Sequence, residues 1–283
     1  MVNLVKGVLK GLINTFLNFI TEARVGEYLN SQIIARAMVR KQTIKHEEVE
    51  IILSTPNSLN EFRASSFSVK EPETLEWIDQ IPNGSVVWDI GANVGLYSCY
   101  AAKKRGCRVF SFEPSIFNLE LLARNIFNNQ LQDLITIVPL PLFESLSVNK
   151  LNLSSTEWGG ALSTFGYDFG HDGEKMNKVF EFSTIGISMV DAVKLLNIPQ
   201  PDYIKLDVDG IEHLILKGGG FVLENVKGIL IEINDDFEKQ AGDAMQYLEK
   251  SGLVLKEKRH AEYFDNSIFN KTFNQIWQRN HSA

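Results

Sequence analysis

The chain of 283 residues has only two cysteines, Cys99 and Cys107, and no apolar run of the ~20 residues that a membrane-spanning helix needs. Two cysteines spaced as neither a metal knuckle nor a redox pair exclude a disulfide-dense secreted scaffold. Lys6 and Lys10 interrupt the apolar residues at the N-terminus, so we expect no cleaved signal peptide. We therefore expect a cytoplasmic protein.

Positive charge is scarce outside the N-terminus. The net charge is −7, and residues 1–45 hold seven Lys or Arg against Glu22 and Glu27, which gives +5 there and leaves −12 on the remainder. A protein that binds nucleic acid over a broad surface needs a basic face. We therefore expect no nucleic-acid partner.

Residues 1–45 are predicted to form a basic, amphipathic helical extension. Apolar residues recur at helical spacing from Val5 to Ile20, and a second helical pattern runs from Ile33 to Met38. Two interpretations stay open: contact with an anionic membrane surface, peripheral at its inner face, or packing on the same domain or a second subunit. Only two lysines and no Trp in the first helix favour packing.

Residues 46–283 are predicted to form one α/β domain. Strands are expected at 86–90, 108–112 and 134–138, with helices between them, and the alternation resumes with a strand at 203–208. This order predicts a parallel sheet with right-handed crossovers and helices on both faces. Residues 139–187 break the alternation and are expected to form an insertion over one end of the sheet.

The first chemical motif is VVWDIGANVGLYS, in which a strand turns through Gly91 and Gly95 into a helix. Glycines at such a turn let a ligand approach the backbone, and the helix N-terminus faces that ligand. A dinucleotide fingerprint would have glycine where Asn93 stands. Asp89 would repel a pyrophosphate and suits a ligand with a cationic amine.

The second motif is VFSFEP, which ends the next predicted strand with Glu113 and Pro114. An acid at this place accepts hydrogen bonds from both hydroxyls of a ribose. Together, a ribose-binding acid and an amine-compatible first loop indicate a nucleoside with an amino-acid tail. S-adenosyl-L-methionine (SAM) has this structure.

The third motif is YIKLDVDGIEHLILKGG, from Tyr203 to Gly219. Asp207 and Asp209 end a strand at the edge where open α/β sheets bind ligands, and Glu212 and His213 open the next helix. These four residues are the candidates for acid–base catalysis, and their order is left open. Lys205 is expected to pair with Asp207 within the sheet.

These motifs, with VFSFEPSIFNLELLARNI, GILIEIN and TFNQIWQR, resemble the FkbM family of SAM-dependent methyltransferases over about 85–280. The resemblance implies a Rossmann-like class I methyltransferase with a seven-stranded, mostly parallel sheet. Its strand order would be 3-2-1-4-5-7-6, with the last strand antiparallel. Residues 1–70 lie outside the resemblance.

The resemblance also implies O-methylation of a hydroxyl, on a sugar in a bacterial surface glycan or glycolipid or on a glycosylated natural product. The methionine end of SAM would lie against four residues of the first motif: Asp89, Gly91, Asn93 and Gly95. Glu113 would hold the ribose, with Pro114 beside it, and Asp207 would lie near the transferred methyl. Trp158 and Gly159, in the insertion, would lie over the acceptor, although Trp158 is nearly as well explained by ordinary packing.

A magnesium ion that assists catalysis is a less favoured hypothesis. Its hard oxygen ligands would be Asp207, Glu232, Asn234 and Asp235 at the ends of neighbouring strands. The alternative for Asn234 and Asp235 is the cap of the following helix.

Two other functions stay open. One is a non-catalytic scaffold docked to a glycan-assembly complex, which the intact set of Asp89, Glu113 and Asp207 argues against. The other is a nucleotide-cofactor oxidoreductase, which Asn93 and Asp89 argue against. Methylation of nucleic acid is disfavoured because the body is acidic and no N-P-P-Y-like motif occurs.

Overall fold

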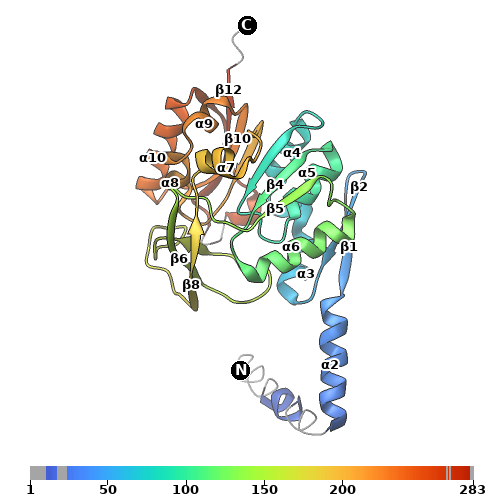
Figure 1. Cartoon of the computed structure of the whole chain (residues 1–283). Coiled ribbons are helices and arrows are strands. Elements are labelled where there is room, and N and C mark those ends of the chain that lie inside the picture. Colours follow the sequence, from blue (N-terminus) through green and yellow to red (C-terminus); the bar gives the residue numbers. More distant parts are fainter. Residues whose placement is uncertain (1–10, 18–23, 266, 268, 281–283) are drawn as a thin grey trace.

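The computed structural model describes residues 11–17, 24–265, 267 and 269–280, and its centre is a seven-stranded sheet (Figure 1). In spatial order the strands are β11, β12, β10, β9, β3, β4 and β5. Their bounds are Val86–Ile90 for β3, Arg108–Phe112 for β4, Ile135–Val138 for β5, Tyr203–Leu206 for β9, Gly228–Asn234 for β10, Leu253–Arg259 for β11 and Thr272–Arg279 for β12.

The strand order agrees with the prediction. Numbered along the chain, the strands run 3-2-1-4-5-7-6 from β5 to β11. β12 is antiparallel to both β10 and β11, and the other neighbours are parallel. The predicted Rossmann-like fold is therefore confirmed.

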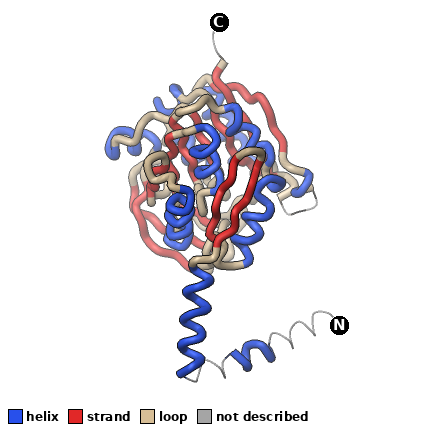
Figure 2. Tube along the Cα trace, turned by 90° about the vertical axis from the view of Figure 1, so that its right-hand side faces the viewer, coloured by secondary structure: helices blue, strands red, loops and turns tan. Residues whose placement is uncertain are grey.

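Helices cover both faces of the sheet (Figure 2). On one face lie α3 (Ser58–Lys70), α4 (Pro72–Gln80), α5 (Leu96–Arg105) and α6 (Ile116–Asn129). On the other face lie α7 (Met189–Leu196), α8 (Glu212–Lys217), α9 (Gly220–Asn225) and α10 (Glu238–Lys250).

The central strands are apolar on both sides because each face has its own hydrophobic core. In β3, Val87 packs with α3 to α6, whereas Trp88 and Ile90 pack with the helices of the opposite face. Side chains alternate between the faces of a strand, so a continuous apolar run is what a doubly covered sheet requires.

The predicted insertion at 139–187 contains a three-stranded antiparallel sheet in the order β7-β6-β8. Its strands are β6 (Ser147–Leu153), β7 (Ser163–Phe165) and β8 (Phe180–Gly186). With three residues, β7 is too short to show an alternating strand pattern in the sequence. Buried Leu151 and Phe165 join the core of the main domain, which fixes this small sheet against it.

The N-terminal region differs in part from the prediction. Residues 11–17 are helical and α2 spans Arg24–Met38, which stands out from the body (Figures 1 and 2). The rest of the predicted first helix lies outside the described residues. The predicted boundary at residue 45 falls within a hairpin of β1 (Lys41–His46) and β2 (Val49–Ser54). This hairpin packs on α3, α5 and α6 through buried Ile51 and Leu53, so it belongs to the body.

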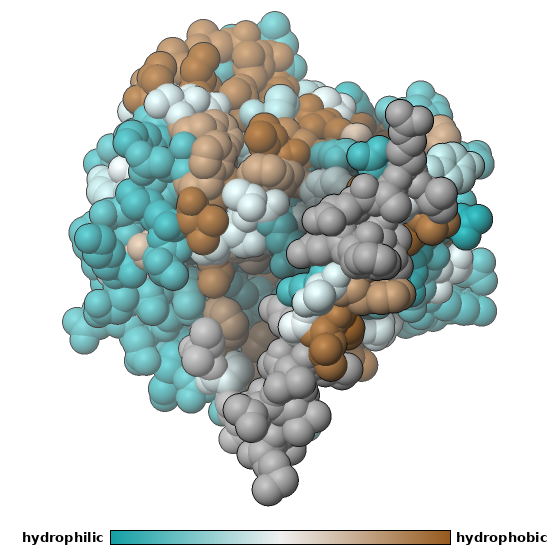
Figure 3. Space-filling view, turned by 90° about the horizontal axis from the view of Figure 1, so that it is seen from below, coloured by the Kyte–Doolittle hydropathy of each residue, from teal (hydrophilic) through white to brown (hydrophobic). Residues whose placement is uncertain are grey.

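Helix α2 exposes the apolar side chains of four residues: Tyr28, Leu29, Ile33 and Ile34. The view from below shows brown, apolar side chains among teal, polar ones on this side of the protein (Figure 3). No helix of the described residues has both the length and the apolar character needed to cross a membrane.

Helix α3 was not predicted. Its sequence, SLNEFRASSFSVK, is rich in Ser and its few apolar residues give a weak helical pattern. The side chain of Asn57 caps its N-terminus by accepting a hydrogen bond from the backbone N–H of Asn60. Ala64 and Phe67 bury its inner face against the core.

Candidate active site

Two adjoining cavities lie at the carboxyl ends of β3, β4 and β9. Their volumes are about 60 Å³ and about 310 Å³. Residues that line both cavities are Gly91, Asn93, Ala161, Asp207 and Asp209. This is the edge at which open α/β sheets bind their ligands.

The turn after β3 depends on two glycines. Gly91 has φ +84°, and a Cβ placed there would lie 1.8 Å from the carbonyl oxygen of Asp207. Gly95 has φ +80° and begins α5, where a Cβ would lie 2.4 Å from Cδ1 of Leu122. Gly91 therefore lets two strand ends meet at the cavity, whereas Gly95 serves the packing of α5 on α6 and lines neither cavity.

Asp89 lies behind the cavities and not in their walls. Its carboxylate accepts a hydrogen bond from Ser98 Oγ, which in turn contacts Ser111 Oγ at 2.7 Å. Burial raises the pKa of Asp89. In the described structure this residue ties β3 to α5 and lines neither cavity, and its contact with a cofactor amine stays a prediction.

Glu113 ends β4 and lines the smaller cavity together with Pro114. One carboxylate oxygen accepts the backbone N–H of Asn93 at 2.8 Å, and the other accepts that of Ser115 at 2.7 Å. Burial raises the pKa of Glu113 to about 7, although these hydrogen bonds by themselves would lower it. Oε1, which accepts the N–H of Ser115, also accepts a long hydrogen bond from Nδ2 of Asn118 at 3.5 Å, so Oε2 is the oxygen that keeps a lone pair for a ligand hydroxyl.

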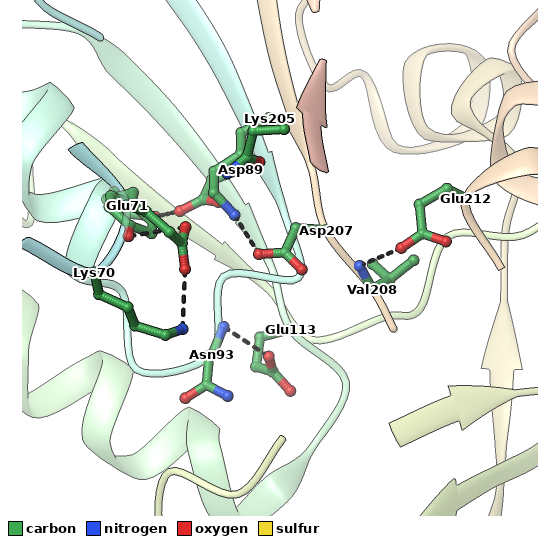
Figure 4. Close-up of polar contacts among 12 residues, drawn as sticks. Lys70, Glu71, Asp89, Asn93, Glu113, Lys205, Asp207, Val208 and Glu212 are labelled. Atoms are coloured by element: carbon green, nitrogen blue, oxygen red, sulfur yellow. Dashed lines mark hydrogen bonds and ion pairs between the residues drawn. The ribbon is translucent and has the colours of Figure 1, made fainter. Parts of the chain in front are cut away.

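Asp207 lies at the junction of the two cavities. Its carboxylate pairs with the buried Lys205 Nζ at 2.8 Å, as predicted (Figure 4). The exposed fraction of the Asp207 side chain is 25%, and it lines both cavities. Burial would lower the pKa of Lys205, but the negative charges of Asp207, Asp89 and Glu71 outweigh burial and raise it. Asp207 therefore sits beside a permanent cation and faces open space.

A second ion pair, which the sequence did not suggest, forms another part of the wall. Lys70 Nζ pairs with Glu71 at 2.9 Å, and the hydroxyl of Tyr97 donates to the same carboxylate at 2.9 Å (Figure 4). Burial opposes ionisation of Glu71, but Lys70 and Lys205 outweigh it and lower its pKa to about 2. Glu71 is therefore charged at neutral pH.

Asp209 also lines both cavities, but its carboxylate is engaged. It accepts the backbone N–H of Leu162 at 2.8 Å and has φ +62°. Burial, assisted by the charge of Asp207, raises the pKa of Asp209 to about 6. This residue anchors the insertion to the loop after β9.

Glu212 and His213 line neither cavity, although the sequence placed both in the catalytic set. The Glu212 carboxylate turns back to accept the backbone N–H groups of Val208 and Gly210, away from Asp207 (Figure 4). His213 is buried against the ring of Phe237, and burial lowers its pKa to about 4. Both residues therefore support the structure around the site and do not line its cavities.

Hydrogen bonds to backbone carbonyls hold the loop at Trp158 and Gly159 in place. The Trp158 carbonyl accepts hydrogen bonds from Asn57 and Asn60 of the α3 region, and the Gly159 carbonyl accepts two from Arg63. Trp158 and Gly159 line neither of these two cavities, and their contact with an acceptor stays a prediction. The loop reaches the cavities through its next residues.

Gly160 is the next residue that attaches this loop to the walls of the cavities. Its carbonyl accepts amide hydrogens from Asn93 at 2.9 Å and from Asn118 of α6 at 3.0 Å. The insertion is thereby bound to the turn after β3 and to α6. Residues 160–161 thus form part of the cavity wall beside Glu113.

A family profile described as "Methyltransferase FkbM domain" matches residues 89–255, more than half of the chain. The chain belongs to the FkbM methyltransferase family. The matched range contains Glu113, Asp207 and Asp209, and the sequence resemblance is thereby confirmed.

Individual relatives are distant. The hexuronic acid methyltransferase AglP of Haloferax volcanii is 27% identical over 158 residues, which cover 56% of this chain and 59% of that protein. Methyltransferase FkbM of Methylobacillus flagellatus has a TM-score of 0.47 at 14% identity, covering 88% of this chain and 58% of its own. TYW2 of M. jannaschii, solved with AdoMet, has a TM-score of 0.42 at 13% identity, covering 85% and 87%. The fold assignment rests on the strand order and not on these scores.

The residues predicted to bind magnesium are dispersed. Glu232 lines the larger cavity with Asp207, but Asp235 pairs with Lys258 and Asn234 donates to the carbonyl of His171. Asn234 Oδ1 also accepts the backbone N–H of Asp236, but the N-cap of α10 is Phe237 and no side chain caps this helix, so the capping alternative is wrong as well. The predicted four-ligand set is therefore not assembled among the described residues.

Other residues of the cavity walls were missed because they lie on α3 or make contacts across the fold. Arg63, Lys70 and Glu71 line the larger cavity and come from the unpredicted helix and its end. Asn118 lines the smaller cavity. The only sequence signal was the adjacency of Lys70 and Glu71, which is common on protein surfaces.

Proposed function

We propose that this protein is a SAM-dependent O-methyltransferase that acts on a hydroxyl of a sugar within a glycan or glycolipid. The observation that carries the proposal is the joining of two cavities at Asp207. The smaller has a ribose-type acid, Glu113, and the larger has room for an acceptor. Membership of a methyltransferase family supports the reaction class.

The donor set of the smaller cavity suits the ribose of SAM, whose methionine end would extend into the larger cavity. Glu113 would accept one ribose hydroxyl through the remaining lone pair of Oε2, and the second hydroxyl would replace the long contact of Asn118 at Oε1. Asn93 lines both cavities, and its buried Oδ1 has no hydrogen-bond partner among the described residues, so it offers an acceptor to a ligand. Gly91 and Asn93 would lie along the methionine end.

Catalysis in this proposal relies on Asp207. SAM, when bound, supplies an electrophilic methyl group for in-line displacement, so positioning supplies much of the rate. Asp207 accepts the proton of the attacking hydroxyl, and Lys205 Nζ, 2.8 Å away, holds the Asp207 carboxylate in place. Asp209 is less suited to this role because Leu162 occupies its carboxylate.

The acceptor class has support from one relative, whose name states that it methylates a hexuronic acid. That protein extends beyond the part that this chain matches. A sugar hydroxyl also suits the larger cavity, because aromatic rings such as Phe67 and Phe269 line it beside polar groups.

Calorimetric titration with S-adenosyl-L-homocysteine (SAH) and with NAD tests the cofactor. We expect SAH to bind in the micromolar range and NAD not to bind. Binding of NAD alone would favour the oxidoreductase alternative. Binding of neither would remove the methyltransferase proposal and leave the scaffold alternative.

The affinity for SAH is expected to depend on pH through Glu113. Its pKa of about 7 in the free protein means that the carboxylate form, which accepts both ribose hydroxyls, is lost as pH falls. We expect about tenfold weaker binding at pH 6 than at pH 8, with proton release on binding near pH 6.5. Glu113→Gln should bind weakly with a flat profile; a profile unchanged by this substitution would contradict the assignment.

The Glu212→Gln variant tests whether Glu212 acts as a catalytic base or as a positioning residue. Because the Glu212 carboxylate accepts N–H groups from Val208, Gly210 and Gln240, an amide places one donor against another. We expect about 1–3 kcal/mol lower free energy of unfolding by urea titration, with turnover at most a few-fold lower. If turnover instead fell by about 100-fold in a variant of unchanged stability, Glu212 would return to the catalytic set.

A further inference from the structure

The larger cavity contains a cation without a direct counterion. Arg63, on α3, lines this cavity and is half-buried. Its Nε and Nη2 donate to the carbonyl of Gly159 at 3.2 Å and 2.6 Å. Among the described residues, no carboxylate forms an ion pair with it. Burial accordingly lowers the pKa of Arg63, although nearby Asp209 opposes that change.

The other cations of the same wall are already paired. Lys70 pairs with Glu71, and Lys205 pairs with Asp207, at 2.9 Å and 2.8 Å. Both pairs are held together by short contacts and need no further anion. Arg63 is therefore the cation in this wall whose charge is least compensated by direct contact.

The geometry of Arg63 leaves one edge of the guanidinium for a ligand. A guanidinium has five N–H groups, and two of them are used by Gly159. The remaining three are on Nη1 and Nη2, an edge that matches the two oxygens of a carboxylate. The bonds to Gly159 also fix the orientation of the side chain, so little side-chain entropy remains to be lost on binding.

We propose that Arg63 binds a carboxylate of the acceptor sugar and so selects a uronic acid over a neutral hexose. This inference rests on the sugar methyltransferase function proposed above. It places the acceptor between α3 and Asp207, in the larger cavity, and not against Trp158. A half-buried, partly desolvated cation favours an anionic ligand because that ligand supplies the missing counterion.

The test compares methyl glucuronide with methyl glucoside, which differ in a carboxylate and a hydroxymethyl group. Their affinities for the SAH-loaded protein and their kcat/KM with SAM are measured for wild type, Arg63→Met and Arg63→Lys. Arg124→Met is the matched control, since Arg124 lies on α6, pairs with Glu120 and lines neither cavity.

We expect wild type and the Arg124→Met control to prefer the glucuronide at least about tenfold. Arg63→Met should reduce the preference to near one with the affinity for SAH within about twofold, and Arg63→Lys should retain part of it. The preference should also weaken at high salt.

Two results would overturn the inference. Equal affinity of the wild-type protein for the two sugars is one. The other is a preference that survives in Arg63→Met while SAH affinity falls, which would assign Arg63 to the carboxylate of the cofactor. If the glucuronide binds selectively through Arg63 but neither sugar is methylated, the inference stands and the proposed function fails.

Discussion

Asp207→Asn is expected to lower methyl transfer by at least about 100-fold while the affinity for SAH stays within about tenfold. Asp207 faces both cavities and retains a partly exposed carboxylate beside Lys205 Nζ. Asparagine keeps the shape and size of the side chain but cannot take a proton from the acceptor hydroxyl. Single-turnover methyl transfer and calorimetry on the same preparation measure the two quantities.

Asp202→Asn provides the control at the other end of the same strand region. Asp202 precedes β9, pairs with Lys227 at 2.7 Å and lines neither cavity. We expect its turnover to stay close to that of the wild-type protein. Asp209→Asn should lower turnover less than Asp207→Asn does. The reverse order, or full turnover in Asp207→Asn, would remove Asp207 from the mechanism.

Gly91→Ala is expected to lower the free energy of unfolding by about 3–5 kcal/mol and to abolish SAH binding. The added methyl would lie 1.8 Å from the carbonyl oxygen of Asp207, so β3 and β9 would have to separate at the cavity. A positive φ adds strain of about 1–2 kcal/mol. Urea titration at 25 °C and calorimetry measure the two effects.

The Gly84→Ala variant measures the backbone strain of a positive φ without the steric clash. Gly84 has φ +75°, and a Cβ there would meet nothing within 4 Å. We expect a loss of only about 1–2 kcal/mol and unchanged SAH affinity. Equal destabilisation by the two substitutions would mean that close approach of the strand ends does not constrain residue 91.

Most of the sheet could be predicted because its strands carry short apolar runs bounded by turn residues. The predicted bounds of β3 and β4 agree with the structure, and Gly84 and Gly106 stand before these runs. α3 and β1 were missed for physical reasons. Helix α3 has a Ser-rich sequence stabilised by tertiary contacts, and β1 exposes most of its side chains, so neither has a strong periodic pattern.

The site was predicted only as far as the direction of each side chain could be inferred. Glu113 and Asp207 reach the cavities from the ends of β4 and β9, because the carboxyl ends of these parallel strands lie at one edge of the sheet, on either side of β3. Asp89 also ends a strand, yet its side chain points to Ser98 on α5. Glu212 begins a helix, but whether its carboxylate faces a ligand or the backbone of residues 208–210 depends on the loop conformation.

The most direct test of the account is transfer of an isotope-labelled methyl group from SAM to hexuronic acid glycosides, with the products analysed by mass spectrometry. The account predicts labelled O-methyl sugar with the wild-type protein and at least about 100-fold less with Asp207→Asn. A protein that binds SAH yet labels no sugar hydroxyl, whether acidic or neutral, would contradict it.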